Sequence, residues 1–268
     1  MSNKKYLLSA LMPFTFLTAA FLTACNQAPQ NTASQSNQEV NQNYERYKVV
    51  TESNNIPFVY LNEKGSPIGF DIDIMQAIAD DQKFHVDYEV TVWHALMDDM
   101  ANNQADLGLA SISITEERKQ KYQFSEPYFQ SQLAVLTKSG QKIDKSSDFS
   151  AFRGQKIGVK KGTIADVTAQ NLKLTTKPQA ENFLAITDFL TAETQGVIGD
   201  IGVMQYYQKQ YADKNLAVIT ESDSKLDNYG IIVNKNNSEL LKKVNTGLKN
   251  IKANGKYQQI EQKWFGES

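Results

Sequence analysis

Residues 106–119 carry two serine hydroxyls, a threonine hydroxyl and a guanidinium within one short stretch. Ser111 and Ser113 come at the end of an apolar run, and Arg118 follows a Thr-Glu-Glu helix start. Thr115 suits an N-cap, because its hydroxyl can accept a backbone N–H that the first helical turn leaves unpaired. An arginine can hold both oxygens of a carboxylate with its planar fork. The stretch therefore predicts a carboxylate receptor, although the same residues would also suit a solvated helix start.

The segments around this stretch alternate between strand and helix, which predicts an α/β protein with mainly parallel sheets. Ligands of such sheets bind beyond the C-terminal ends of the strands. Glu52, Trp93, Ser111 and Arg118 all fall at or just after such ends. We predict strands at residues 47–51, 86–90, from 106, 156–160, 196–200, 216–220 and 229–233, and helices at 69–79, 93–101, 164–172, 181–190, 201–211, 238–254 and 256–264.

Asp71 and Asp73 could be mistaken for a catalytic carboxylate pair. Both lie at the start of the helix predicted over residues 69–79, where a short acidic side chain can cap the free N–H groups. We therefore expect a structural role, with Asp71 as the helix cap. Farther along the chain, residues 138–150 are polar, and this change in composition suggests a crossing between two lobes.

Composition excludes several classes of protein. The chain has 268 residues, 41% of them hydrophobic, so it can bury a substantial core. Its formal net charge of −2 argues against nucleic acid and against an anionic membrane surface as partners. One cysteine cannot form an internal disulfide, and two histidines without ligand spacing predict no zinc site. We expect no metal and no cofactor.

The N-terminus has the pattern of an export signal. Lys4 and Lys5 precede an apolar segment that ends in Leu-Thr-Ala-Cys25, too short and too interrupted for a convincing membrane span. This ending resembles a bacterial lipobox, in which Cys25 is lipidated; the alternative is an ordinary secretory signal with an incidental cysteine. We assign residues 1–24 to a lipoprotein signal peptide. Residues 25–43 are rich in Gln, Asn and Ser and predict a flexible tether.

Seven short motifs occur in an order that resembles the polar amino-acid-binding members of the bacterial extracellular solute-binding protein family 3, which supply ABC importers. The resemblance covers residues 44–266. The motifs are Gly69-Phe-Asp-Ile-Asp73, Ser111-Ile-Ser-Ile-Thr-Glu-Glu-Arg118, Phe124-Ser-Glu-Pro-Tyr-Phe129, Ile157-Gly-Val-Lys-Lys-Gly-Thr163, Tyr229-Gly-Ile231, Asn254-Gly-Lys-Tyr257 and Lys263-Trp-Phe-Gly266.

This resemblance implies a two-lobe periplasmic-binding-protein clamshell with two chain crossings between the lobes. The chain would leave lobe 1 near residues 133–138 and return near Tyr229, so that the C-terminal helices pack on lobe 1. The expected lobes are residues 44–135 with 230–268, and residues 136–229.

The resemblance also implies that an α-amino acid binds in the cleft. Arg118 would hold the α-carboxylate with help from Ser113 and from Thr163, which starts a helix and so offers free N–H groups. Asp200 would take the α-ammonium together with Ser111. Without the family, Asp200 would be interpreted as the cap of the helix that follows it.

Four residues bear on the ligand's side chain, and their implications differ. Trp93 would form an aromatic floor, although a tryptophan at a helix start is often a core residue. Asn55 stands where relatives often have an aromatic lid. Glu52 suggests a side chain with donors, whereas Lys160 suggests an amide or an acceptor unless its amine is solvated. An arginine- or lysine-type ligand and glutamine both remain open, as does cystine.

The expected function is that of a receptor, not an enzyme. It would be a monomer, held by lipidated Cys25 on the periplasmic or outer face of a bacterial membrane, that delivers a free amino acid to an ABC transporter permease. One alternative is a clamshell enzyme such as a dehydratase, but no nucleophile–histidine–acid pattern or metal set is visible. Another alternative is a binding module in a sensor or an adhesin.

Overall fold

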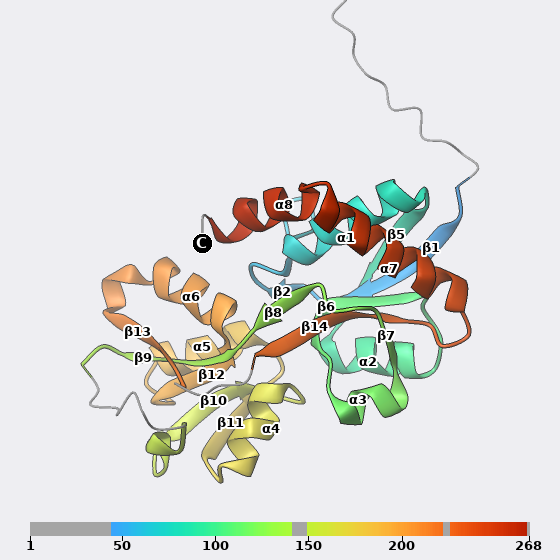
Figure 1. The fold of residues 1–268 in the computed structure, drawn as a ribbon. Coiled ribbons are helices and arrows are strands. Elements are labelled where there is room, and N and C mark those ends of the chain that lie inside the picture. Colours follow the sequence, from blue (N-terminus) through green and yellow to red (C-terminus); the bar gives the residue numbers. More distant parts are fainter. Residues whose placement is uncertain (1–43, 141–148, 222–225, 267–268) are drawn as a thin grey trace, which may run out of the picture. The chain divides into compact units, whose positions relative to one another are not determined.

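The computed structural model describes residues 44–140, 149–221 and 226–266, which contain two large sheets and one small sheet. Each large sheet is accompanied by its own helices (Figure 1). We call the part built on β1 lobe 1 and the part built on β10 lobe 2.

Lobe 1 has the strand order β5-β1-β6-β14-β7, and β8 also pairs with β14. β5, β1 and β6 are parallel, so their C-terminal ends lie at one edge. The strands are β1 (Arg46–Thr51), β5 (His85–Val90), β6 (Leu107–Ser113), β7 (Gln123–Phe124), β8 (Phe129–Ser131) and β14 (Asp227–Val233). The helices are α1 (Phe70–Gln82), α2 (Trp93–Ala101), α3 (Glu116–Lys121), α7 (Ser238–Ala253) and α8 (Lys256–Phe265). The small sheet contains β2 (Asn54–Asn55), β3 (Val59–Leu61) and β4 (Pro67–Ile68).

Lobe 2 has the strand order β11-β10-β12-β9-β13. β11, β10 and β12 are parallel, whereas β9 runs antiparallel to both β12 and β13. The strands are β9 (Leu133–Lys138), β10 (Lys156–Lys160), β11 (Thr175–Gln179), β12 (Gly196–Asp200) and β13 (Leu216–Thr220). The helices are α4 (Ile164–Asn171), α5 (Asn182–Leu190) and α6 (Ile201–Gln210), with short 3-10 turns η1 (Phe149–Phe152) and η2 (Ala212–Lys214).

The sheets are mixed, not mainly parallel as the alternating pattern suggests. Strands β9 and β14 account for the difference, because they carry the chain between the lobes and pair antiparallel with their neighbours. β8 still belongs to the lobe 1 sheet and β9 to the lobe 2 sheet, so the outward crossing lies at Gln132. It therefore precedes the polar stretch at residues 138–150, where composition suggests a crossing.

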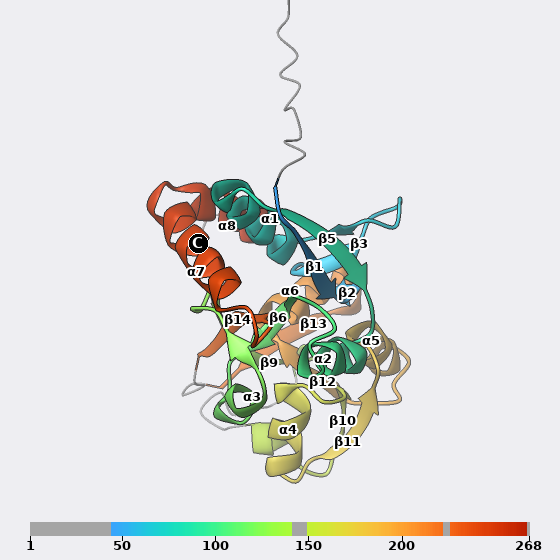
Figure 2. The same ribbon diagram turned by 90° about the vertical axis from the view of Figure 1, so that its right-hand side faces the viewer.

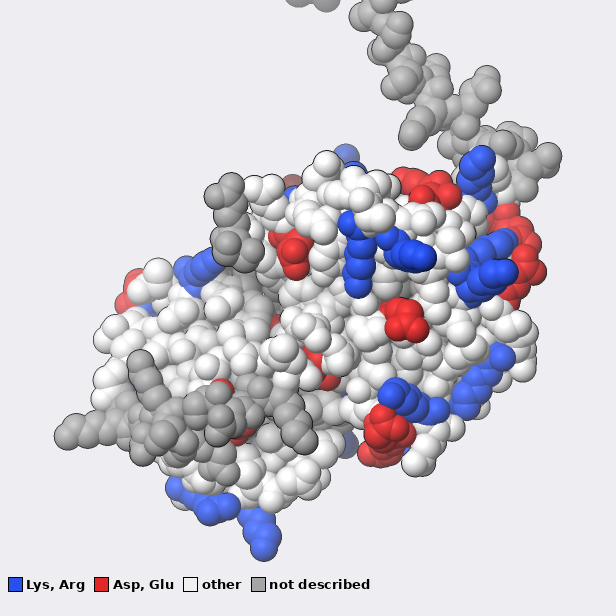
Figure 3. All heavy atoms as spheres, viewed as in Figure 1, with Lys and Arg blue, Asp and Glu red and all other residues white. Residues whose placement is uncertain are grey.

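The C-terminal helices cover α1 of lobe 1. Figure 2 shows α7 and α8 beside α1, and their contacts confirm this packing. Ile74 and Ile78 on the buried side of α1 have no exposed surface. At Gly247 of α7, an added Cβ would lie 2.8 Å from a methyl group of Ile78, so a larger residue would push the helices apart. Charged side chains of both signs are interspersed on the face drawn in Figure 3.

Candidate ligand-binding site

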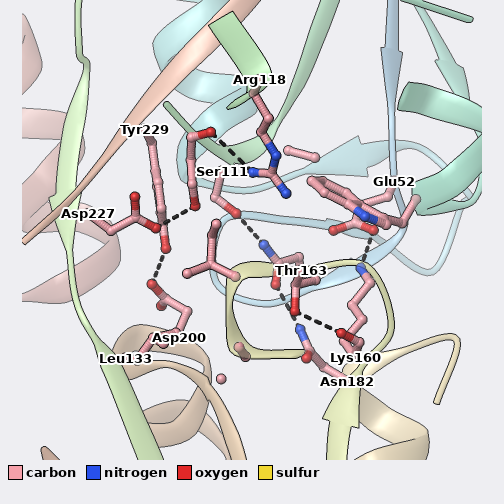
Figure 4. Close-up of a pocket in the computed structure, with 17 residues that line it drawn as sticks. Glu52, Ser111, Arg118, Leu133, Lys160, Thr163, Asn182, Asp200, Asp227 and Tyr229 are labelled. Atoms are coloured by element: carbon pink, nitrogen blue, oxygen red, sulfur yellow. Dashed lines mark hydrogen bonds and ion pairs between the residues drawn. The ribbon is translucent and has the colours of Figure 1, made fainter. Parts of the chain in front are cut away.

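A cavity of about 60 Å³ between the lobes is lined by every residue that the sequence nominates for ligand binding. A single water molecule needs about 10–15 Å³, so the cavity has room for a few waters. The walls must move apart before an amino acid can enter. The nine residues are Glu52, Asn55, Trp93, Ser111, Ser113 and Arg118 from lobe 1, and Lys160, Thr163 and Asp200 from lobe 2 (Figure 4). Cys25, the predicted lipidation site, lies outside the described residues.

Arg118 reaches the cavity from the short helix α3. The predicted cap is confirmed, because the Thr115 hydroxyl accepts the backbone N–H of Arg118 at 3.1 Å. The guanidinium donates to the carbonyl of Ser113 at 3.1 Å and more weakly to that of Gly162 at 3.5 Å. Burial lowers the pKa of Arg118, and the nearby carboxylate of Asp227 opposes this effect. A guanidinium remains charged at neutral pH even so.

Trp93 forms one wall between the two cationic side chains of the cavity. Its ring centroid is 5.3 Å from the Arg118 guanidinium carbon and 5.5 Å from the Lys160 ammonium nitrogen. The indole N–H donates to the Gly162 carbonyl of lobe 2 at 3.2 Å. One side chain therefore contacts both lobes and offers an aromatic face to the cleft.

Ser111 owes its position to Asp71. Ser111 has a φ of 44°, in the left-handed region that non-glycine residues seldom occupy. Its N–H donates to the Asp71 carboxylate at 2.6 Å, and the Tyr128 hydroxyl donates to the other carboxylate oxygen at 2.8 Å. The prediction that Asp71 caps its own helix is wrong: Gly69 holds that position, and the carboxylate instead accepts buried donors from other elements. Burial raises the pKa of Asp71 to about 7.

Lys160 and Glu52 form an ion pair across the cleft. The Lys160 ammonium donates to the Glu52 carboxylate, and their side chains are only 3% and 2% exposed. The alternative of a solvated Lys160 amine is therefore wrong. A second carboxylate, Glu181, has an oxygen 3.8 Å from the same ammonium. That buried oxygen has no hydrogen-bond partner among the described residues, and burial raises the pKa of Glu181. This part of the site thus holds two carboxylates for one ammonium.

Asn55 joins the lobes through amide contacts. Its Nδ2 donates to the Ser111 hydroxyl, and its carbonyl oxygen accepts from Asn182 of α5 at 3.0 Å. A polar residue at this position is thus explained by polar partners on both sides. Sequence reasoning does not identify Asn182, since its role depends on the approach of α5 to β2.

Asp200 ends β12 and caps α6. One carboxylate oxygen accepts the N–H groups of Gly202 and Val203 at 2.7 and 3.2 Å, which confirms the capping interpretation. The other oxygen accepts the hydroxyls of Ser131 and Tyr229. Ser131 and Tyr229 lie on β8 and β14, so Asp200 of lobe 2 is bonded to both crossing regions. Burial raises the pKa of Asp200.

Thr163 stands before α4, but its side chain does not cap the helix. Its hydroxyl donates to the Lys160 carbonyl at 2.7 Å, while the Asp166 carboxylate accepts the N–H of Gly162 at 2.9 Å. The first residues of α4 line the cavity. The positive end of the α4 dipole therefore faces the site.

Asp227 and Tyr229 also line the cavity, although the sequence does not nominate them. The Ser113 hydroxyl donates to Asp227, whose pKa burial raises to about 6. The sequence feature that could have identified them is the Tyr-Gly-Ile motif: Tyr229 is its first residue, and Asp227 lies two residues before it. Within the described residues, no group of three or more acidic, histidine or cysteine side chains is arranged to hold a metal. In the same part of the chain, no helix is long and apolar enough to span a bilayer.

Two comparisons of sequence identify relatives of this chain. Residues 47–267 match the bacterial extracellular solute-binding proteins, family 3. A protein of Neisseria gonorrhoeae named probable histidine-binding protein is 28% identical over 271 residues, which cover 100% of this chain and 97% of that protein. The arginine-binding periplasmic protein of Mannheimia haemolytica is 30% identical over 222 residues, which cover 81% of this chain and 90% of that protein.

Solved structures extend the likeness to the fold. An ancestral arginine-binding protein bound to glutamine has a TM-score of 0.76 and 31% identity, covering 83% of this chain and 98% of its own. The ancestral amino acid-binding protein AncCDT-1, a precursor of cyclohexadienyl dehydratase, has a TM-score of 0.74 and 27% identity, covering 82% and 95%. The predicted two-lobe α/β fold is confirmed. The chain belongs to family 3 of the bacterial extracellular solute-binding proteins.

Proposed function

We propose that this protein is the amino-acid receptor of an ABC importer. The supporting observation is that Arg118 of lobe 1 and Asp200 of lobe 2 line the same cavity with opposite charges. An α-amino acid carries a carboxylate and an ammonium a short distance apart, so it can join these two groups. Arg118 takes the carboxylate with Ser113 and the α4 end at Thr163. The ammonium lies toward Asp200.

The ligand's side chain lies against Trp93 and reaches the Lys160–Glu52 pair. We propose a neutral amide of the glutamine type, because an amide offers an acceptor to the ammonium and donors to the carboxylate without separating them. Leaving that buried pair intact avoids the cost of an uncompensated charge. The named relatives include an ancestral arginine-binding protein bound to glutamine.

A cationic side chain is the second candidate, and Glu181 favours it. The Glu181 oxygen without a hydrogen-bond partner in the described structure could accept a guanidinium or imidazolium donor. The two sequence relatives are named for histidine and arginine. A cationic side chain would use this second carboxylate, whereas an amide would bind the Lys160–Glu52 pair, so the two candidates differ in their use of Glu181.

The remaining assignments rest on the family and on the N-terminal sequence. We propose that the receptor is a monomer, that lipidated Cys25 anchors it outside the cytoplasm, and that its protein partner is the permease. We propose no catalytic activity.

The test is a ligand screen of protein that has been unfolded, dialysed and refolded to remove carried ligand. Thermal shift against the twenty amino acids and cystine, followed by calorimetry, should identify one class with a clear rise in Tm. The same amino acid as its methyl ester should bind poorly, because it lacks the carboxylate for Arg118. A refolded protein that binds no amino acid would overturn the proposal.

A further inference from the structure

Protein donors already use most of the acceptor positions of Asp200, the carboxylate toward which the ligand's ammonium lies. A carboxylate offers about four lone-pair sites to donors. In the structure Asp200 accepts two backbone N–H groups on one oxygen and two hydroxyls, from Ser131 and Tyr229, on the other. An ammonium has three N–H donors and no acceptor, so it needs a carboxylate with open positions.

Asp227 supplies such positions. Within the described residues, the Ser113 hydroxyl is the one donor to its carboxylate, and this bond uses a single oxygen. Asp227 lines the cavity, and Figure 4 draws it beside Tyr229, near Asp200 and across from Arg118. Its backbone is held by pairing with Ser131 in β8, which limits how far the carboxylate can move.

We propose that Asp227 binds the ligand's α-ammonium directly, as a second carboxylate beside Asp200. This inference rests on the proposed function and adds a specificity residue to it. The carboxylate end of the ligand is held at Arg118, and Ser113 links that residue to Asp227: its carbonyl accepts from the guanidinium and its hydroxyl donates to the Asp227 carboxylate. An amino group one carbon from the bound carboxylate can therefore reach Asp227. A ligand without that amino group would leave two acidic side chains facing each other with no cation between them.

The surroundings make this contact sensitive to pH. Among the residues that the structure describes, the charged and titratable groups that face Asp227 are Arg118 from α3, Asp200 from β12 and Tyr229 from its own strand. Burial and the charge of Asp200 raise the pKa of Asp227 to about 6, while Ser113 and Arg118 oppose the rise. A bound ammonium stabilises the ionised form, so binding near pH 6 should release a proton, and affinity should fall as pH falls through 6.

The test compares Asp227→Asn with the wild type by calorimetry. The probes are the amino acid that binds best in the screen, beginning with L-glutamine, and its deaminated analogue (4-carbamoylbutanoate for glutamine). At pH 8 we expect Asp227→Asn to weaken the amino acid at least tenfold and the analogue less than twofold. Near pH 6, two buffers of different ionisation heat should reveal proton release in the wild type and not in the variant.

Asp213→Asn is the control, because it also removes one negative charge but from an exposed side chain in η2. It should match the wild type with both probes. Equal losses for the amino acid and the analogue would assign Asp227 a structural role and overturn the inference, as would unchanged affinity. If Asp227→Asn fails to fold, Asp227→Glu replaces it in the calorimetric comparison, and proton release on ligand binding is measured with the wild type. The absence of that proton release overturns the inference. A wild type that binds no amino acid at all would instead overturn the proposed function.

Discussion

Lys160 of lobe 2 donates to Glu52 of lobe 1 in an ion pair from which solvent is almost wholly excluded. Withdrawing two charges from water is costly, and removal of one partner leaves the other as an uncompensated buried charge. Because this pair joins the lobes, the remaining charge can regain water if the lobes separate. The ion pair therefore affects the separation of the two lobes as well as the binding of the ligand.

Lys160→Met should accordingly open the ligand-free protein. Without the ammonium, the carboxylates of Glu52 and Glu181 face each other, and their repulsion favours separation of the lobes. Small-angle scattering should give a larger radius of gyration for the variant than for the wild type. Lys161→Met is the matched control, since Lys161 is exposed. Superimposable curves for all three proteins would contradict the prediction.

Arg118→Ala should lose most of the affinity for the amino acid. Truncating one partner of a buried charge pair typically costs about 2–5 kcal/mol, which is on the order of 30- to several-thousand-fold in Kd. Calorimetric titration measures the loss, with Asp200→Ala in parallel. Lys119→Ala, the neighbouring residue with an exposed ion pair to Glu116, should change Kd by much less than tenfold. Near-wild-type affinity in folded Arg118→Ala would contradict the proposal that Arg118 binds the ligand's carboxylate.

Asp71→Asn should flatten the dependence of stability on pH. The folded pKa of Asp71 is about 7, whereas an unfolded aspartate titrates near 3.9. Between these values the folded state holds a proton that the unfolded state has lost, so the free energy of unfolding falls as pH rises from about 4 to 7. The limiting slope from one such group is about 1.4 kcal/mol per pH unit.

Urea denaturation between pH 4.5 and 8 would measure this effect. Asp227 and Asp200 shift in the same direction, so Asp71→Asn should reduce the slope without abolishing it. Asp213→Asn again serves as the control and should leave the slope unchanged. If Asp71→Asn and the wild type gave the same slope, the pKa of Asp71 would have to be the same in the folded and unfolded states, which would contradict the prediction.

Cys25→Ala should release the protein from the membrane. The prediction follows from the Leu-Thr-Ala-Cys sequence, since a lipid anchor at this residue is the proposed attachment. Fractionation of cells producing each protein should find the wild type with membranes and the variant in the soluble fraction. Amino-acid binding should be equal in the two. A variant that stays with membranes would argue for the ordinary secretory signal or for another attachment.

Local patterns in the sequence predict most of the elements, and the family resemblance nominates nine of the residues that line the cavity. Apolar runs bounded by polar turns locate strands such as β10 and β12, and Thr115 marks the start of α3. β11 has no such pattern: its sequence is Thr-Thr-Lys-Pro-Gln, which contains Pro178 and no apolar run. It forms as an edge strand beside β10, where the missing N–H of a proline is tolerated.

The errors concern contacts between residues far apart in the chain. Asp71 has the position of a helix cap, yet its partners are Ser111 and Tyr128, which only the packed fold brings close. Asp227 reaches the cavity because β14 pairs with β6, which sets Tyr229 opposite Ser113. Residue spacing encodes helix and strand periods, but it does not encode which strand another strand will join.

The chain order of the lobes has a consequence for folding during synthesis. Lobe 2 is continuous from β9 to β13, whereas lobe 1 needs β14, α7 and α8, which follow lobe 2 in the sequence. In a chain that emerges N-terminus first, lobe 2 can complete its sheet while Ile74 and Ile78 of α1 still await their cover from α7. In that order of folding, a finished lobe 2 would coexist with an uncovered apolar surface on α1. A chaperone that shields α1 would matter most in that interval.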